Sequence, residues 1–373
     1  MSSSNAEDSY TTDGIFTDAI AADNVWADAN MVFIKYCSSD SWMGDAAASS
    51  ATFGFAFRGA RIIDATMQSL VSVNGLGKTP GAKLLFGGCS AGGRGVVTSL
   101  DKVKSDLATI APSVEVKGLN DAGGWVDVQP AYPNLLSLQN QTAAIFKFST
   151  PPVGATTGGL ACLADFPDEP WKCVWPSYRL PFVTTPYVLN AAQFDSFLIS
   201  YNTNHEAANA PGGTAYLEQY QTATLALFAK LPATVAIWSS TCFIHCVSSN
   251  ADYFCFTVEG KTLNSVVNDF VFDATVTRTI SSCSGWACTN DCAGGPLSIW
   301  EPENLPPTAT PYCTAFYDQI QASDANVNHQ IATSEHSDAG GQSQSQQHLA
   351  TSMLSQMGVT ALHPTTTSNS TSR

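Results

Sequence analysis

A short glycine-flanked segment contains the serine whose chemistry is easiest to interpret. Gly88-Cys89-Ser90-Ala91-Gly92-Gly93 fits the pattern G-x-S-x-G, in which a serine occupies a sharp turn between a strand and a helix. Glycines flank such a serine because side chains would clash inside the turn. The segments before and after it have the composition of a buried strand and of a helix. We therefore predict that Ser90 is a nucleophile, at a helix N-terminus that favours developing negative charge.

A serine hydroxyl needs a base within hydrogen-bond reach, and the base needs a carboxylate that orients it. In α/β-hydrolases these residues follow in the chain order serine, acid, histidine. His245 lies just after a predicted strand, in a loop between two cysteines, whereas His205 lies in a polar loop. The other four histidines lie in or near a polar C-terminal region: His329, His336, His348 and His363. The order therefore favours His245 as the base.

The acid is expected to follow a strand between Ser90 and His245. Asp195 does so, in the segment Leu189-Asn190-Ala191-Ala192-Gln193-Phe194-Asp195. Asp121 and Asp127 follow an earlier predicted strand and are rivals for the same role. The pattern of residue types alone leaves this choice open.

The elements that must position these side chains alternate along the chain. Helical spacing of apolar residues covers about 55–73, and a second helix is predicted at 91–104. Strands rich in β-branched and aromatic residues are predicted at the following ranges: 31–36, 83–88, 114–119, 186–191 and 233–238. Strands that alternate with helices form a mostly parallel sheet flanked by helices on both faces. The predicted fold class is therefore α/β.

Composition excludes several classes of function. The chain has 373 residues and a net charge of −15, with only 13% charged residues. Nucleic-acid binding is not expected, because phosphate contacts need clustered Lys and Arg. No apolar run reaches the ~18 residues that a membrane span needs. Eleven cysteines, without the paired Cys-x-x-Cys spacing of a zinc ribbon, predict disulfides, an oxidising compartment and no metal site.

Five segments together resemble the pectin acetylesterase and Notum family of carboxylesterases. They are the run 30–40 (Asn-Met-Val-Phe-Ile-Lys-Tyr-Cys-Ser-Ser-Asp), the Ser90 turn, Asp121-Ala122-Gly123, the run 189–196 and Ser240-Thr241-Cys242-Phe243-Ile244-His245-Cys246. The resemblance covers about residues 14–292, where Cys283, Cys288 and Cys292 are similar to a cysteine cluster that closes the family domain. It implies an α/β-hydrolase-like, disulfide-stabilised fold.

The resemblance also implies roles for individual residues. Asp195 matches the acid of the family triad, which favours it over Asp121, and His245 matches the base. The N–H group of Ala91 is expected to donate to the oxyanion, as the residue after the nucleophile does. Trp42, Trp125 and Trp175 are candidates for lining a substrate pocket.

The start of the chain departs from the family pattern. Family members have a Gly-Gly-Gly-Trp-Cys loop that supplies further oxyanion donors, and no such motif precedes Asn30. We expect an N-terminal truncation, which would account for the missing signal peptide and weaken catalysis. By composition, residues 1–14 are predicted to be disordered, residues 15–320 to form the α/β-hydrolase-like esterase domain, and residues 321–373 to be a low-complexity polar tail.

The implied reaction is hydrolysis of an O-acyl ester without a cofactor, by a secreted or cell-wall monomer. The favoured substrate is an acetylated polysaccharide such as pectin. One alternative is Notum-like removal of a longer acyl chain from a lipidated protein, and another is an inactive hydrolase fold that serves as a secreted binding protein. The sequons at Asn140 and Asn369 are consistent with a glycoprotein.

The cysteines allow a few pairing predictions. Cys162 and Cys173 are close enough in sequence to form a local bridge. Cys242 and Cys246 are expected to pair separately with Cys255 and other partners, which would fix the His245 loop. Because the count is odd, one thiol is left over, and Cys89 in the serine turn is predicted to be that free thiol.

Overall fold

The structure is a computed structural model that describes residues 13–17, 24–291 and 313. All of these residues belong to one compact unit that spans residues 2–320. The predicted tail at 321–373 and most of the predicted N-terminal region at 1–14 lie outside the described residues.

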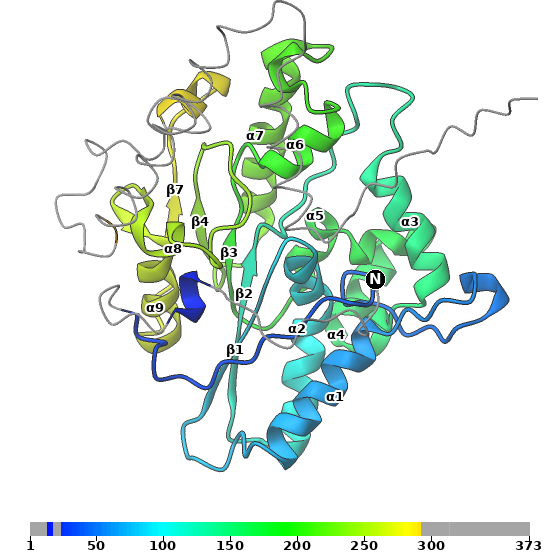
Figure 1. Ribbon diagram of the computed structural model, residues 1–373, viewed down its shortest axis with the longest axis vertical. Coiled ribbons are helices and arrows are strands. Elements are labelled where there is room, and N and C mark those ends of the chain that lie inside the picture. Colours follow the sequence, from blue (N-terminus) through cyan, green and yellow to red (C-terminus); the bar gives the residue numbers. More distant parts are fainter. Residues whose placement is uncertain (1–12, 18–23, 292–312, 314–373) are drawn as a thin grey trace, which may run out of the picture. The chain divides into compact units, whose positions relative to one another are not determined.

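A five-stranded parallel sheet forms the centre of the fold. Its strands are β1 (Lys83–Cys89), β2 (Glu115–Asp121), β3 (Tyr187–Asn190), β4 (Ala236–Ser239) and β7 (Arg278–Ile280), in the order β1-β2-β3-β4-β7. Figure 1 shows the strands side by side, all running in the same direction. Cys89 lies opposite Asp121, and Asp121 opposite Asn190. The carboxyl ends of the strands therefore meet at one rim, as the alternating sequence pattern predicts.

Helices connect the strands and cover both faces of the sheet. The α-helices are α1 (Gly59–Ser72), α2 (Ala91–Ile110), α3 (Leu138–Ser149), α4 (Thr157–Asp165), α5 (Pro176–Arg179), α6 (Ser196–Asn202), α7 (Gly213–Lys230), α8 (Asp252–Cys255) and α9 (Leu263–Phe272). Short 3₁₀ helices occupy Gly14–Phe16, Ser50–Thr52, Val153–Ala155, Pro170–Val174, Leu180–Phe182, Ala207–Asn209 and Trp286–Asp291. A two-stranded ribbon joins β5 (Thr257–Val258) to β6 (Lys261–Thr262).

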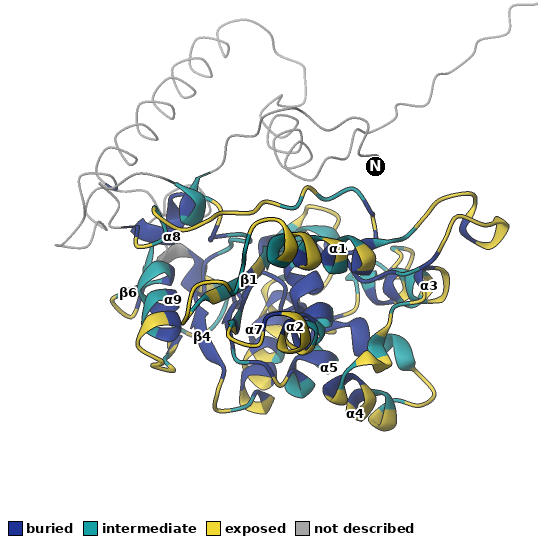
Figure 2. Ribbon diagram, turned by 90° about the horizontal axis from the view of Figure 1, so that it is seen from below, coloured by how far each residue is buried: buried dark blue, intermediate teal, exposed yellow. Residues whose placement is uncertain are grey.

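Alternate side chains of the strands enter two separate hydrophobic cores. Leu189 and Ile237 join the larger core with residues of α1, α2 and α7, whereas Val188 and Trp238 join the smaller core with α8 and α9. Figure 2 shows buried residues on the strands and on the helix sides that face them. This three-layer arrangement confirms the predicted mostly parallel sheet flanked by helices.

Two predicted elements differ from the structure. Residues 31–36 form no strand, and Val32 and Phe33 are about half exposed. A strand needs a hydrogen-bonded neighbour, and β-branched composition alone does not supply one. The helix predicted from residue 55 begins at Gly59, because Phe57 instead forms a β-bridge with Ala46.

Candidate active site

The turn between β1 and α2 has the geometry of a nucleophile elbow. Ser90 follows the last residue of β1 and precedes Ala91, the first residue of α2. Its backbone has φ 55° and ψ −114°, a region that L-residues rarely occupy and that costs on the order of 1–3 kcal/mol. The Ser90 N–H group donates to the Asp121 carbonyl at 2.9 Å. The strained turn is therefore held in place by the neighbouring strand.

Two glycines allow the chain to cross itself so closely at this turn. A Cβ atom at Gly88 would lie 2.5 Å from the carbonyl carbon of Gly92, and one at Gly93 would lie 2.7 Å from the Asp121 carbonyl oxygen. Neither position can accept a side chain without a backbone shift. Ala91 begins α2, so its N–H group is among the first four of the helix, which have no intrahelical acceptor.

Asp195 and His245 come together at the same rim of the sheet. Asp195 follows β3 and caps α6 by accepting a hydrogen bond from the Leu198 N–H group at 2.9 Å through Oδ1. Its other oxygen, Oδ2, lies 2.7 Å from His245 Nδ1. The Ser196 N–H group donates to the Ile244 carbonyl at 3.0 Å, which joins the start of α6 to the histidine loop. This geometry suits a carboxylate that orients an imidazole.

His245 Nε2 faces away from that carboxylate. It is buried and has no hydrogen-bond partner among the described residues, so the Ser90 hydroxyl is not bonded to it here. Such bonds are often long in unliganded enzymes and tighten when substrate binds. Nε2 is thus the ring atom that remains available for a proton, and the catalytic roles of Ser90, His245 and Asp195 stay predictions.

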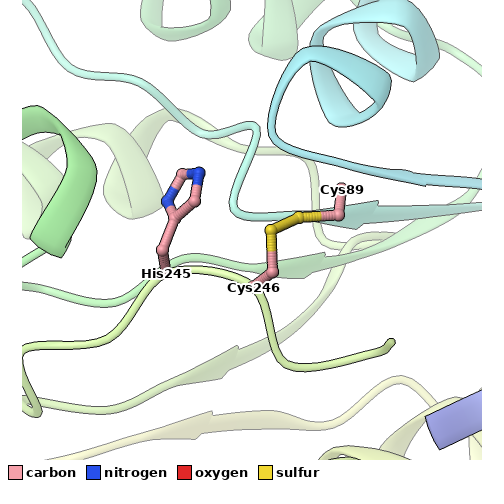
Figure 3. A group of neighbouring side chains, drawn as sticks. All are labelled: Cys89, His245 and Cys246. Atoms are coloured by element: carbon pink, nitrogen blue, oxygen red, sulfur yellow. A yellow bond between two sulfur atoms is a disulfide. The ribbon is translucent and has the colours of Figure 1, made fainter. Parts of the chain in front are cut away.

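A disulfide joins the residue before Ser90 to the residue after His245. Cys89 and Cys246 are bonded across 157 residues of sequence, with their Cα atoms 5.9 Å apart (Figure 3). The prediction that Cys89 is the free thiol is therefore wrong. Among the described residues, the free cysteine is Cys37. The disulfide keeps the elbow and the histidine loop next to each other.

The same three residues have the spacing of a metal site but not its chemistry. A ring nitrogen of His245 and the sulfurs of Cys89 and Cys246 lie within 4.8 Å of one another (Figure 3). Cysteine binds metals as a thiolate, and both sulfurs are bonded to each other. The group therefore does not fit a metal ion.

The remaining disulfides confirm one pairing prediction and correct another. Cys162 pairs with Cys173, as predicted. Cys255 pairs with Cys313 rather than with either cysteine beside His245. Sequence spacing did not reveal this, because disulfide partners are set by how the chain folds back on itself. Cys283 and Cys288 also pair, while Cys292 lies outside the described residues.

Asp121 and Asp127, the two rival candidates for the acid, have different environments, and Asp127 accepts hydrogen bonds from Gln139 and Tyr178. Asp121 is fully buried, and its carboxylate accepts hydrogen bonds from the Val247 and Ser248 N–H groups and from the Ser248 hydroxyl, at 2.6–3.3 Å. The Asn190 amide donates to it as well. Asp121 thus supports the segment just after His245 and does not contact the imidazole through a hydrogen bond. This supporting role could not be read from the sequence, although Asp121 follows the strand predicted at 114–119, which was a usable signal.

Burial and charge shift the pKa values of several groups near the rim. Burial lowers the pKa of His245, but the charge and hydrogen bond of Asp195, helped by Asp121, outweigh it and raise the pKa above its ordinary value. Burial raises the pKa of Asp121 despite its hydrogen bonds. Burial, with a contribution from the Asp121 charge, raises the pKa of Asp252 to about 7. Protonated His245 is therefore favoured by the carboxylates that surround it.

The three tryptophans proposed as pocket lining are all buried in the larger core. Trp125 is 5% exposed, and Trp175, which packs edge-on against it, is 0% exposed. Trp42 packs against Tyr36. It also lies so close to Gly95 that a Cβ atom there would be 2.8 Å from the Trp42 Cβ atom. Trp125 alone of the three lines the small pocket that reaches Asp195. Its role toward a substrate stays a prediction.

Two further residues at the site were not found from sequence. Phe197 packs on the imidazole of His245, with ring centroids 5.3 Å apart. Arg94, in the first turn of α2, is buried against Trp125 and Trp175. Neither residue belongs to a recognisable motif, so their contacts could not be inferred before the fold was known.

Comparison with known proteins places this geometry in context. The sequence model of the Pectinacetylesterase family matches residues 1–293. The chain is 29% identical over 275 residues to palmitoleoyl-protein carboxylesterase NOTUM of Drosophila melanogaster, a match that covers 72% of this chain and 39% of the fly protein. It is 24% identical over 294 residues to pectin acetylesterase 11 of Arabidopsis thaliana, covering 70% of this chain and 69% of the plant protein.

The fold has a counterpart among solved structures. A crystal structure of the Wnt deacylase Notum from Drosophila superposes with a TM-score of 0.68 and 26% sequence identity, covering 76% of this chain and 79% of that one. Human NOTUM is 31% identical over 209 residues, which cover 52% of this chain and 40% of the human protein. The chain thus spans about two fifths of the length of the fly and human Notum proteins. Within the part of the chain that the structure describes, no helix is both long enough and apolar enough to cross a bilayer.

Proposed function

Because the chain belongs to the pectinacetylesterase family, we propose that it is a serine carboxylesterase with Ser90 as nucleophile, His245 as base and Asp195 as the acid. The observation that carries the proposal is the 2.7 Å contact between Asp195 Oδ2 and His245 Nδ1. It leaves Nε2, which has no hydrogen-bond partner among the described residues, as the ring atom available to accept the serine proton. The disulfide between Cys89 and Cys246 supports the pairing of elbow and histidine.

The chemistry follows from these positions. His245 Nε2 takes the hydroxyl proton while Ser90 Oγ attacks the ester carbonyl, and Asp195 holds the imidazole in the tautomer that leaves Nε2 unprotonated. The Ala91 N–H group, free at the start of α2, donates to the oxyanion. His245 then protonates the departing alcohol and activates the water that releases the acid. The cycle thus forms an acyl ester on Ser90 Oγ and hydrolyses it, and His245 carries the proton in both halves.

We further propose that the acyl group is short, with acetyl esters of pectin or another cell-wall polysaccharide as substrates. The similarity to pectin acetylesterase 11 of Arabidopsis thaliana, over 70% of this chain and 69% of the plant protein, supports an acetyl ester. Four disulfides among the described residues support an oxidising, extracellular or cell-wall location.

A Notum-like removal of a longer acyl chain is the second candidate. The fold similarity to the fly Wnt deacylase favours it. The two candidate reactions need different pockets next to Ser90, because a long acyl chain needs a deep apolar pocket and an acetyl group does not. Acyl-chain length is therefore the property that separates them.

The test compares nitrophenyl acetate with nitrophenyl octanoate on the full chain, followed by acetate release from acetylated pectin. We expect a higher kcat/KM for the acetyl ester. A clear preference for octanoate would instead support the Notum-like reaction. Ser90→Ala should reduce turnover on the order of 10⁶-fold and abolish labelling by a fluorophosphonate probe. Full activity in that variant would refute the nucleophile, and an unreactive parent protein would indicate an inactive binding protein.

A further inference from the structure

One short helix presents two different side chains to the same imidazole. Asp195 caps the start of α6 and hydrogen-bonds the edge of the His245 ring at Nδ1. Phe197, two residues later on α6, covers the face of the ring, with centroids 5.3 Å apart and planes inclined by 34°. The imidazole is therefore held at its edge by a carboxylate and on its face by an aromatic ring. Because both contacts come from one helical turn, they are set together.

A second aromatic ring lies behind Phe197. Trp125 packs on Phe197 with centroids 5.2 Å apart and an interplanar angle of 31°. The Trp125 indole is fixed in turn, since its Nε1–H group donates to the Ala122 carbonyl at 2.9 Å and its side chain is 5% exposed. Phe197 therefore rests on a rigid support and cannot easily move away from His245.

A buried arginine closes the stack at its far end. Arg94 is 5% exposed, and its Cζ atom lies 4.8 Å from the centre of a Trp125 ring and 5.7 Å from that of Trp175. Its Nη2 donates to the Thr142 hydroxyl at 3.0 Å, but Nε has no partner among the described residues. Burial lowers the pKa of Arg94 to about 10, so the guanidinium remains charged at neutral pH.

Arg94 connects the stack to the helix that follows the nucleophile. Arg94 lies four residues after Ser90, and its N–H group donates to the Ser90 carbonyl at 2.9 Å. The stack of Arg94, Trp125, Phe197 and His245 thus runs from the first turn of the nucleophile's helix to the base. A buried cation without an ion pair is costly, and aromatic faces are one environment that compensates for this cost.

We propose that Phe197 is a positioning residue that stabilises the protonated imidazole of His245 through its ring face, and that Trp125 and Arg94 hold Phe197 in place. This inference rests on the proposed function, in which His245 becomes a cation each time it accepts the serine proton. A cation within about 6 Å of an aromatic centroid is attracted to the negative face of the ring. The neutral imidazole gains less from the same contact, so Phe197 favours the charged form.

Other groups also act on the charge of His245. Asp195 at the start of α6 and Asp121 at the end of β2 both favour the protonated ring. Arg94 is the cation of the stack, and two aromatic rings separate it from the imidazole. Substitutions at Phe197 leave all three charges in place, so they isolate the contribution of the ring face.

The test measures the pKa of His245 directly, by NMR of the full chain with ¹³C-labelled histidine, the signal being assigned with a His245→Gln variant. Phe197→Leu keeps an apolar side chain but removes the ring face, so the pKa should fall by about half a pH unit. Phe197→Tyr and Phe197→Trp retain a ring face and should retain the pKa. Phe243→Leu is the matched control, because Phe243 lies in the histidine loop but packs on Trp286.

The kinetic readout should agree with the titration. In Phe197→Leu, kcat for an acetyl ester should fall about two- to fivefold, KM should change less, and the acid limb of kcat/KM should move to lower pH. An unchanged or raised His245 pKa in Phe197→Leu, or an equal shift in the Phe243 control, overturns the inference. If the parent protein has no esterase activity but the pKa still falls, the stacking is upheld and only the proposed function fails.

Discussion

Removing the disulfide between Cys89 and Cys246 should damage both the stability and the catalysis of the proposed esterase. The bond closes a loop of 157 residues between the nucleophile elbow and the histidine loop. The perturbation is the double substitution Cys89→Ala with Cys246→Ala. The local disulfide between Cys162 and Cys173 spans 11 residues. Its removal is a control, because it breaks the same kind of bond but neither cysteine is adjacent to Ser90 or His245.

The magnitudes follow from the entropy of loop closure in the unfolded chain. The chain-entropy relation gives about 5 kcal/mol of unfolding free energy for the long loop and about 3 kcal/mol for the short one. The long loop also joins the two residues adjacent to Ser90 and His245. A displacement of about 1 Å between reacting groups can lower turnover on the order of a hundredfold. We therefore expect kcat to fall by about tenfold to a hundredfold when the Cys89–Cys246 disulfide is removed, which is the effect that a displacement of this size would have.

The assays are urea unfolding followed by tryptophan fluorescence, and turnover of nitrophenyl acetate under conditions where both variants are folded. The pair Cys162→Ala with Cys173→Ala should lose stability but keep its kcat. The reasoning fails if both double variants lose the same unfolding free energy, or if turnover falls equally in the two. Equal losses of unfolding free energy would refute the loop-closure estimate, and equal losses of turnover would mean that the Cys89–Cys246 link does not position the elbow against the histidine loop.

Further predictions concern the carboxylates and the histidine. Asp195→Asn should lower kcat about 10⁴-fold, because the amide favours the wrong imidazole tautomer, and ester hydrolysis kinetics measure this. Asp121→Ala should reduce the unfolding free energy by at least about 3 kcal/mol, because it leaves the Val247 and Ser248 N–H groups unpaired, as chemical denaturation would show. The base must be neutral and its pKa is raised, so kcat/KM should decline as the pH falls, with a midpoint above the ordinary histidine value of about 6.5. The raised pKa of Asp252, about 7 against 3.8, means that this group destabilises the fold increasingly as the pH rises from 4 through 7. Asp252→Asn should therefore add roughly 4 kcal/mol at pH 8 and little at pH 4, which unfolding curves at the two pH values would reveal.

The sheet and the choice of His245 were predictable because they depend on chain order, whereas the choice of Asp195 over its rivals came from the family resemblance. In a parallel sheet the carboxyl ends of successive strands meet at one rim. Residues just after predicted strands, such as Ser90 and Asp195, must therefore converge. The strand and helix on either side of Ser90 were clear in composition and spacing, and the structure places β1 and α2 there.

What could not be predicted depends on contacts between distant segments. The segment at 31–36 has the composition of a strand, but a strand also needs a partner. The partner of Cys89 is 157 residues away and becomes evident only when two loops meet at the rim. The stack of Arg94 on Trp125 likewise joins a residue of α2 to a residue of the segment after β2, and the two share no local pattern.

The strained backbone at Ser90 has a consequence for engineering. A glycine at this position would accept φ 55° without penalty, whereas every other residue must bear the strain. Ser90→Gly should thus give a protein that melts at a higher temperature and hydrolyses nothing. A selection for thermal stability alone would therefore enrich inactive variants such as Ser90→Gly. Any effort to stabilise this protein must measure ester hydrolysis as well as the melting temperature.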